Sequence, residues 1–369
     1  MNRREILIST TALLAAAPLA RAADGAKAAE DVSARAHALY ERSIVFDANC
    51  GPPLQEKFPF PKEMLDIVRN SGVTAVKTSL AGTDAKFPDT VAEIAFFQRV
   101  IEEYPEIFLQ VRKASDFARA KREKKFGILF SFESADMFEG KVEYIELFRD
   151  LGVRVMQLSY NKTSPFAAGV LADPPTGLTD LGRKAVEEMN RLGVAIDISH
   201  ANDATSKDVL ALSKVPALIT HGGAKAIHEH PRNKADAILK AVADKGGVVG
   251  IYDLPYLTAS PRQPALDDYM AHMTHVLKIC GEDHVGVGSD SALNAWDMSP
   301  EDFKKMEDYR HQTGVAAPEE DRPMYVEGLN TPRRIEVIAD ALLKRGYSEA
   351  VAEKAIGGNF VRVLGEIWG

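Results

Sequence analysis

The sequence contains few cysteines, few tryptophans and no long apolar run. Only two of its 369 residues are Cys and two are Trp. So few cysteines exclude a small domain stabilised by several disulfides. No apolar stretch reaches the roughly 20 residues that span a bilayer, so we expect no stable membrane anchor. The formal net charge is −8 without a long Lys or Arg run, which argues against nucleic-acid binding because that needs a concentrated basic face.

The remaining composition is that of an ordinary globular protein. Hydrophobic residues make up 46% of the chain and charged residues 27%. These fractions exclude a disordered or collagen-like chain. The length allows either one large α/β domain or two domains of average size.

The first 22 residues have the features of an export signal. Two arginines, Arg3 and Arg4, precede an apolar run over residues 6–17, and the small-x-small sequence at 20–22 fits a cleavage site. Paired arginines before a moderately apolar stretch resemble a twin-arginine signal, and an ordinary Sec signal is the alternative. Either route predicts a periplasmic or secreted protein.

Eight short β-branched apolar runs recur after this signal, each followed by a segment with helical patterning. Their average spacing is about 34 residues, the size of one strand-plus-helix unit. The predicted strands are 44–49, 73–80, 126–133, 153–160, 194–200, 215–221, 247–252 and 284–290.

Eight such units predict an α/β protein with a closed (β/α)8 TIM barrel. Near-continuous apolar strands indicate a parallel sheet buried on both faces. An open doubly wound sheet is the alternative, although no G-x-G-x-x-G follows the first strand. Residues 23–43 form an N-terminal lead-in, and 44–369 form one barrel with C-terminal closing helices.

Polar residues stand where these predicted strands end. Active sites of such barrels lie at the carboxyl ends of the strands. Two imidazoles and two carboxylates arriving from separate strands predict a divalent-metal site, with zinc as the first candidate. Any one of them alone could be a satisfied buried polar group. The strand-end residues are Asp47, Asn49, Glu133, Tyr160, His200, His221 and Asp290.

The other histidines and the two cysteines have simpler interpretations. Six histidines lie in predicted loops, on helices or at a strand start, and we expect surface or capping positions for them: His228, His230, His272, His275, His284 and His311. Cys50 and Cys280 could pair in an oxidising compartment, but two small buried unpaired side chains are the simpler expectation.

Several segments together resemble the membrane (renal) dipeptidase family, peptidase family M19. The similarity rests on GLTDLGRKAVEEMNRLGVAIDISH at 177–200, HPRN at 230–233, GVGSD at 286–290 and GGNFVRVL at 357–364. The resemblance implies a zinc-dependent (β/α)8 barrel that cleaves dipeptides, some with a D-residue at the C-terminal position.

The resemblance also implies roles for individual residues. Glu133 corresponds to a carboxylate that bridges two zinc ions, and His200 and His221 correspond to ligands of the second zinc. Asp290 corresponds to the group that handles the proton of the attacking water. Arg232 corresponds to an arginine that faces the substrate carboxylate.

The chain departs from the family pattern at two places. The family's first strand ends in a His-x-Asp metal pair, where this chain has Asn49 and Gly51. Tyr160 stands where the family has a substrate-contacting histidine. We therefore expect a divergent member with one zinc ion, with Asn49 and Tyr160 on the substrate side. Cys50 is a weaker alternative ligand, since strand alternation points it away from Asn49.

The sequence thus predicts an exported zinc-dependent dipeptidase-like hydrolase that acts on a small peptide or amide. Asp290 and Tyr160 are the predicted catalytic residues, and Arg232 binds substrate. One alternative is a scaffold re-used for isomerisation or elimination on an exported peptide-derived metabolite, and another is a non-catalytic binding protein. A homodimer is left open.

Overall fold

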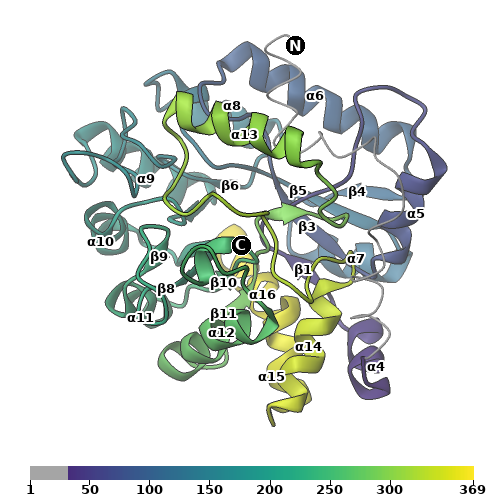
Figure 1. Ribbon diagram of the computed structural model, residues 1–369. Coiled ribbons are helices and arrows are strands. Elements are labelled where there is room, and N and C mark those ends of the chain that lie inside the picture. The colour runs from purple at the N-terminus through teal and green to yellow at the C-terminus, as the bar shows by residue number, and fades with distance from the viewer. Residues whose placement is uncertain (1–31) are drawn as a thin grey trace.

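The computed structural model describes residues 32–369, and the predicted export signal at 1–22 lies outside these residues. Eight parallel strands form the predicted barrel, each hydrogen-bonded to the next in chain order. Figure 1 shows them at the centre of a ring of helices. The barrel strands are β1 (Phe46–Asp47), β3 (Ala75–Ser79), β5 (Phe126–Phe132), β6 (Val155–Met156), β7 (Ala195–Asp197), β8 (Ala217–Ala224), β10 (Val249–Ile251) and β11 (Val285–Val287).

The last strand returns to the first, which excludes the open doubly wound sheet. The Ala48 backbone N–H donates to the Val287 carbonyl at 2.9 Å. Beyond this bond, β2 (Cys50–Gly51) pairs in parallel with β12 (Ser291–Ala292). The predicted (β/α)8 fold is therefore confirmed.

The helices follow the strands as the patterning predicts. Helix α9 (Asp180–Leu192), for example, begins at an N-cap, Thr179, whose side chain accepts from the Gly182 N–H. The helices up to residue 280 are α4 (Ala34–Arg42), α5 (Lys62–Asn70), α6 (Phe87–Glu103), α7 (Ser115–Glu123), α8 (Tyr144–Asp150), α9 (Asp180–Leu192), α10 (Asp203–Leu212), α11 (Asp236–Asp244) and α12 (Leu266–Cys280).

Several short elements were not predicted from the sequence. Strand β4 (Phe108–Gln110) pairs in parallel with the start of β5, and α7 follows it. Strand β9 (Asn233–Lys234) pairs with the end of β8. Strands of two or three residues are too short for a period of two to be recognised.

The end of the barrel opposite the strand carboxyl ends is filled by apolar side chains and closed by the chain terminus. Helices α14 (Arg334–Lys344), α15 (Glu349–Glu353) and α16 (Asn359–Trp368) form this last segment, with a π-helical turn between α15 and α16. Gly286 of β11 leaves room for the Phe360 ring, which a Cβ would meet at 2.4 Å. The apolar side chains that fill this end of the barrel include Phe46, Ala75, Leu129, Val155, Ala195, Leu218, Val248 and Phe360.

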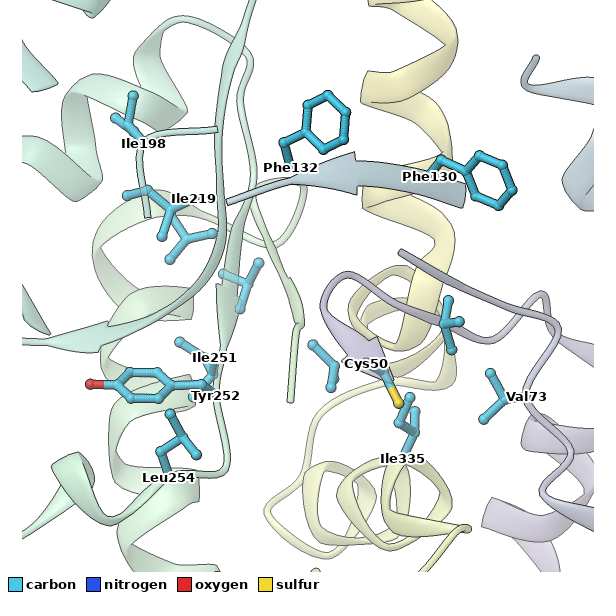
Figure 2. Packing of buried hydrophobic residues seen from close by; sticks show 14 of the residues in the cluster. Cys50, Val73, Phe130, Phe132, Ile198, Ile219, Ile251, Tyr252, Leu254 and Ile335 are labelled. Atoms are coloured by element: carbon cyan, nitrogen blue, oxygen red, sulfur yellow. The ribbon is translucent and has the colours of Figure 1, made fainter. Parts of the chain in front are cut away.

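A larger apolar cluster fills the layer between the strands and the helices. Phe130 and Phe132 project from the same side of β5 into it (Figure 2). Cys50 is buried and belongs to this cluster. Both Cys50 and Cys280 are unpaired.

The connection between β12 and α14 folds over the carboxyl ends of the strands. It contains α13 (Pro300–Thr313), which lies at the front of the barrel in Figure 1. Lys162 Nζ donates to the Thr313 carbonyl at 2.9 Å, and Asn161 Nδ2 donates to the Val315 carbonyl at 2.8 Å. We call the segment of residues 293–330 the cap. These two hydrogen bonds connect the cap to the loop after β6. Within residues 32–369, no helix has the length and apolar character needed to cross a membrane.

Candidate metal centre and substrate pocket

Three of the predicted strand-end residues meet around one point. Glu133 directly follows β5, His200 lies three residues beyond β7, and His221 lies within β8. One ligand atom from each lies within 4.8 Å of the other two. The structure thus brings together the three side chains that we predicted as metal ligands.

The outer nitrogen of His200 is fixed by the loop after β6. His200 Nδ1 lies 2.8 Å from Asn161 Oδ1. Because Asn161 Nδ2 donates to the Val315 carbonyl, its oxygen accepts, and Nδ1 must carry the proton. His200 Nε2 is then an unprotonated nitrogen that faces the site.

His221 is held in the same tautomer by different partners. Its Nδ1 lies 2.9 Å from Thr220 Oγ1, and the Thr220 hydroxyl donates to Asp197 Oδ2 at 2.6 Å. The hydroxyl oxygen must therefore accept from Nδ1–H. Hydrogen bonds of this kind orient histidine ligands and fix their tautomer in metal sites.

The two unprotonated nitrogens, His200 Nε2 and His221 Nε2, lie 3.1 Å apart. Burial lowers the pKa of His200 to about 3 and that of His221 well below its usual range, so neither imidazole supplies a proton. Two facing lone pairs at this distance repel unless a cation lies between them. The two nitrogens and Glu133 therefore fit a zinc ion, which takes imidazole and carboxylate ligands and keeps an open position when three come from the protein.

An irregularity in β8 places His221 in this position. The pairing of β8 with β10 changes from Ile219–Val249 to Gly222–Ile251, so three steps along β8 match two along β10. A bulge of this kind re-aims side chains next to active sites. Gly288 has its Cα close to the displaced strand, and a Cβ there would lie 1.8 Å from the Thr220 carbonyl oxygen. Glycine in the GVGSD segment thus makes room for the bulge.

Asp197 holds the two histidine-bearing strands in register. Its Oδ1 accepts from the Ser199 N–H and the Thr220 N–H, at 3.0 and 3.2 Å. Its Oδ2 accepts from Gln157 Nε2 at 2.8 Å in addition to the Thr220 hydroxyl. We did not single out Asp197 from the sequence, although a carboxylate inside an otherwise apolar strand is a recognisable signal.

Glu133 accepts hydrogen bonds on the oxygen away from the histidines. Asn49 Nδ2 donates to its Oε1 at 2.8 Å and Ser79 Oγ donates to the same atom at 2.6 Å. Burial raises the pKa of Glu133, whereas the positive charge of the nearby Lys77 lowers it. Its other oxygen, Oε2, lies 3.6 Å from His200 Nε2.

Asp290 faces the same space from the end of β11. Its backbone has φ +58°, a left-handed conformation that is uncommon for a residue other than glycine and often marks functional positions. Burial, with a further contribution from Glu133, raises the pKa of Asp290 to about 8. Its Oδ2 lies 3.9 Å from His221 Nε2 and 3.8 Å from Arg232 Nη2.

Arg232 is buried beside Asp290. Its Nη1 donates to the Ser199 carbonyl at 3.0 Å, whereas Nη2 is buried without a hydrogen-bond partner. A buried unsatisfied guanidinium donor is unfavourable, so this nitrogen suits an anionic group of a ligand.

Two histidines that we expected on the surface are buried, and that prediction is wrong for them. His230 Nδ1 accepts from the Arg232 backbone N–H at 3.1 Å, and its Nε2 contacts the Pro318 carbonyl of the cap at 2.8 Å. His272 Nδ1 accepts from the Ala224 N–H at 2.9 Å. Both use their two ring nitrogens inside the structure, which sequence patterning on loops and helices does not reveal.

Tyr160 and the cap complete a pocket of about 250 Å³ above these groups. The Tyr160 ring stacks on His200 with centroids 4.0 Å apart, and burial raises the pKa of its hydroxyl. Arg310 of α13 lines the pocket and is held by two bonds to Glu320, at 2.6 and 2.7 Å. The apolar lining from the cap includes Trp296, Met298, Met306 and Met324.

A parallel barrel with imidazole and carboxylate ligands at its strand ends defines a metal-dependent hydrolase scaffold. The family model described as membrane dipeptidase (peptidase family M19) matches residues 33–316. The chain therefore belongs to the membrane dipeptidase family, and the predicted resemblance is confirmed.

Relatives agree with this assignment. The chain is 29% identical over 286 residues to dipeptidase tcpJ of Claviceps purpurea, which covers 77% of this chain and 61% of that protein. It is 31% identical over 227 residues to the uncharacterized dipeptidase C965.12 of Schizosaccharomyces pombe, covering 60% and 53%. The chain thus matches little more than half the length of these relatives. The crystal structure of an amidohydrolase from Pseudomonas aeruginosa superimposes with a TM-score of 0.79 and 32% identity, covering 90% of this chain and 99% of the other.

Proposed function

We propose that this protein is a zinc-dependent hydrolase that cleaves the amide bond of a dipeptide or a similar small amide. Family membership supports hydrolysis of dipeptides, and the Glu133–His200–His221 cluster supports a zinc ion. A zinc ion at this position supplies Lewis-acid catalysis, which polarises a scissile carbonyl and acidifies water.

Asp290 is the proposed proton carrier. Its Oδ2 faces the space between His221 and Arg232, while its Oδ1 is occupied by Asn49. A carboxylate in this place takes a proton from the attacking water at Oδ2 and returns it to the leaving amine nitrogen.

Arg232 and Tyr160 are the proposed substrate contacts. The unpartnered Arg232 Nη2 fits the C-terminal carboxylate of a dipeptide and orients it against the ligands. Tyr160 lines the pocket, and its hydroxyl is the proposed donor to the oxygen that gains charge in the transition state. A cavity of about 250 Å³ suits a substrate of about two residues.

The observation that carries this proposal is the facing pair of unprotonated imidazole nitrogens next to Glu133 and Asp290. The test is hydrolysis of a dipeptide panel, including D-residues at the C-terminal position, by the zinc-loaded protein. Each dipeptide is paired with its C-terminal amide. We expect turnover of dipeptides and at least 10-fold lower kcat/KM for the amides, since one charged hydrogen bond contributes roughly 1.5–3 kcal/mol. Zinc binding without turnover of any dipeptide would contradict hydrolysis and favour re-use of the scaffold for a non-hydrolytic step.

We also propose that the protein acts in the periplasm or outside the cell. Support comes from Arg3 and Arg4, the apolar run at 6–17 and the cleavage-site sequence at 20–22. N-terminal sequencing of the mature protein should begin near residue 23. Export that continues in a host lacking the twin-arginine translocase would indicate a Sec signal instead.

A further inference from the structure

The first-strand side of the pocket contains an unusual hydrogen-bond arrangement. Asn49 Nδ2 lies 2.8 Å from Glu133 Oε1 and 2.7 Å from Asp290 Oδ1. An amide nitrogen carries two hydrogens, and here each points to a different carboxylate. The opposite amide orientation would set a carbonyl oxygen against two carboxylate oxygens and is excluded by repulsion. Asn49 therefore donates to both acids and does not present its carbonyl as a metal ligand.

From this geometry we propose that Asn49 is a positioning residue that takes the place of a second cation and limits the centre to one metal ion. A cation bridging Glu133 Oε1 and Asp290 Oδ1 would have to occupy the position of Asn49 Nδ2. The inference rests on the metal site of the proposed function but not on the reaction that the site catalyses.

The main chain fixes Asn49 in this position. The Asp290 N–H donates to the Asn49 carbonyl at 2.7 Å, and Ser289 Oγ donates to the same oxygen at 3.2 Å. Asp47 Oδ1 accepts from the Asn49 N–H at 3.1 Å and from the Ser289 N–H at 2.8 Å. Asn49 is only 4% exposed, so its amide has little freedom to turn away from the two acids.

A buried lysine supplies positive charge beneath the same carboxylate. Lys77 is only 1% exposed, and its Nζ donates to Ser131 Oγ at 3.1 Å and lies 3.5 Å from Ser79 Oγ. The Ser79 hydroxyl in turn donates to Glu133 Oε1. Arg232 lies beside Asp290, so each of the two carboxylates already has a cationic neighbour. A second divalent ion would be repelled by both of these cations, Lys77 and Arg232.

Asn49 also decides which carboxylate oxygens remain available. It occupies Oε1 of Glu133 and Oδ1 of Asp290, which leaves Oε2 facing His200 and Oδ2 facing His221 and Arg232. The amide therefore orients Glu133 as a ligand of one cation and Asp290 as a group that meets substrate.

The test is zinc stoichiometry in the full-length mature protein and in Asn49→Asp. Asn49→Asp keeps the shape of the side chain. It replaces an amide that donates two hydrogen bonds with a third carboxylate, next to those of Glu133 and Asp290. We expect one tightly bound zinc per chain in the wild type and two in Asn49→Asp, measured by zinc titration calorimetry and by metal analysis after desalting. The matched control is Asn294→Asp, which adds the same charge to another wall of the pocket and should leave one zinc.

Asn49→Leu provides a second arm in case Asn49→Asp does not fold. It removes both donated hydrogen bonds without adding a ligand, and we expect one zinc with about 10- to 100-fold weaker affinity, as for other outer-shell partners. Two tight zinc ions in the wild type, or unchanged stoichiometry in folded Asn49→Asp together with unchanged affinity in Asn49→Leu, would overturn the inference. Failure of dipeptide hydrolysis with one bound zinc would overturn the proposed function alone.

Discussion

The two sides of the barrel mouth are built with different chemistry. On the β7–β8 side, His200 and His221 each use one ring nitrogen in a hydrogen bond and present the other to the pocket. On the β1–β11 side, a neutral amide from Asn49 joins two carboxylates. The first side presents two bare imidazole nitrogens, whereas the second side holds Glu133 Oε1 and Asp290 Oδ1 by hydrogen bonds from one amide group.

The comparison predicts its largest effect for a histidine on the β7–β8 side. His221→Asn should remove tight zinc binding and lower kcat/KM by more than the roughly 100-fold that loss of an outer-shell partner causes. The physical reason is loss of one of three ligands. A zinc-competition titration measures it, and retention of zinc with nanomolar affinity would show that His221 is not a ligand.

The next effect concerns Asp290, which belongs to the β1–β11 side. Asp290→Asn should lower kcat by about 10²- to 10⁴-fold because it removes the group that moves the proton. Zinc content should remain at one per chain, since Asp290 is not a proposed ligand of that ion. A variant that loses zinc instead would place Asp290 among the ligands.

A smaller effect is expected for the hydrogen bond behind His200. Asn161→Leu should weaken zinc binding about 10- to 100-fold because Nδ1 of His200 loses its acceptor. Asn161 also ties the cap through Val315, so the matched control is Lys162→Met, which removes the neighbouring tie to Thr313 only. Equal zinc affinities in the two variants would mean that the cap, not the imidazole, explains the effect.

The smallest effect is a pH dependence of the free energy of unfolding, caused by the buried His230. Burial lowers the pKa of His230 to about 4 in the folded protein, against about 6.5 in the unfolded chain. Between these values only the unfolded chain binds the proton, so the free energy of unfolding falls as pH decreases from about 6.5 to 4, by up to roughly 1.4 kcal/mol per pH unit. His230→Gln should have a shallower slope in urea unfolding. The exposed His311→Gln is the control, and equal slopes in all three proteins would contradict the assignment.

The sequence predicted the fold and the gathering of site residues because both depend on regular repeats. Eight apolar runs at even spacing specify the barrel, and polar residues at their ends must then meet at one mouth. The cap was harder to predict, since the sequence indicated C-terminal closing helices without showing that α13 lies over the pocket.

The orientation of individual side chains was not predictable, because it depends on contacts between distant segments. The Asn49 amide is turned by acids from β5 and β11, 84 and 241 residues away in the chain. The β8 bulge that orients His221 cannot be recognised from the sequence, because the strand appears there only as a run of apolar residues. Asn161 and Ser79 are ordinary loop and strand residues until Asn161 contacts His200 and Ser79 contacts Glu133.

The most direct test of a single-cation centre is anomalous diffraction at the zinc edge from crystals grown with excess zinc. The account predicts one strong peak in the pocket, within ligand distance of Glu133 Oε2, His200 Nε2 and His221 Nε2, with Asn49 Nδ2 still between the two carboxylates. A second peak of comparable height bridging Glu133 Oε1 and Asp290 Oδ1 would contradict it.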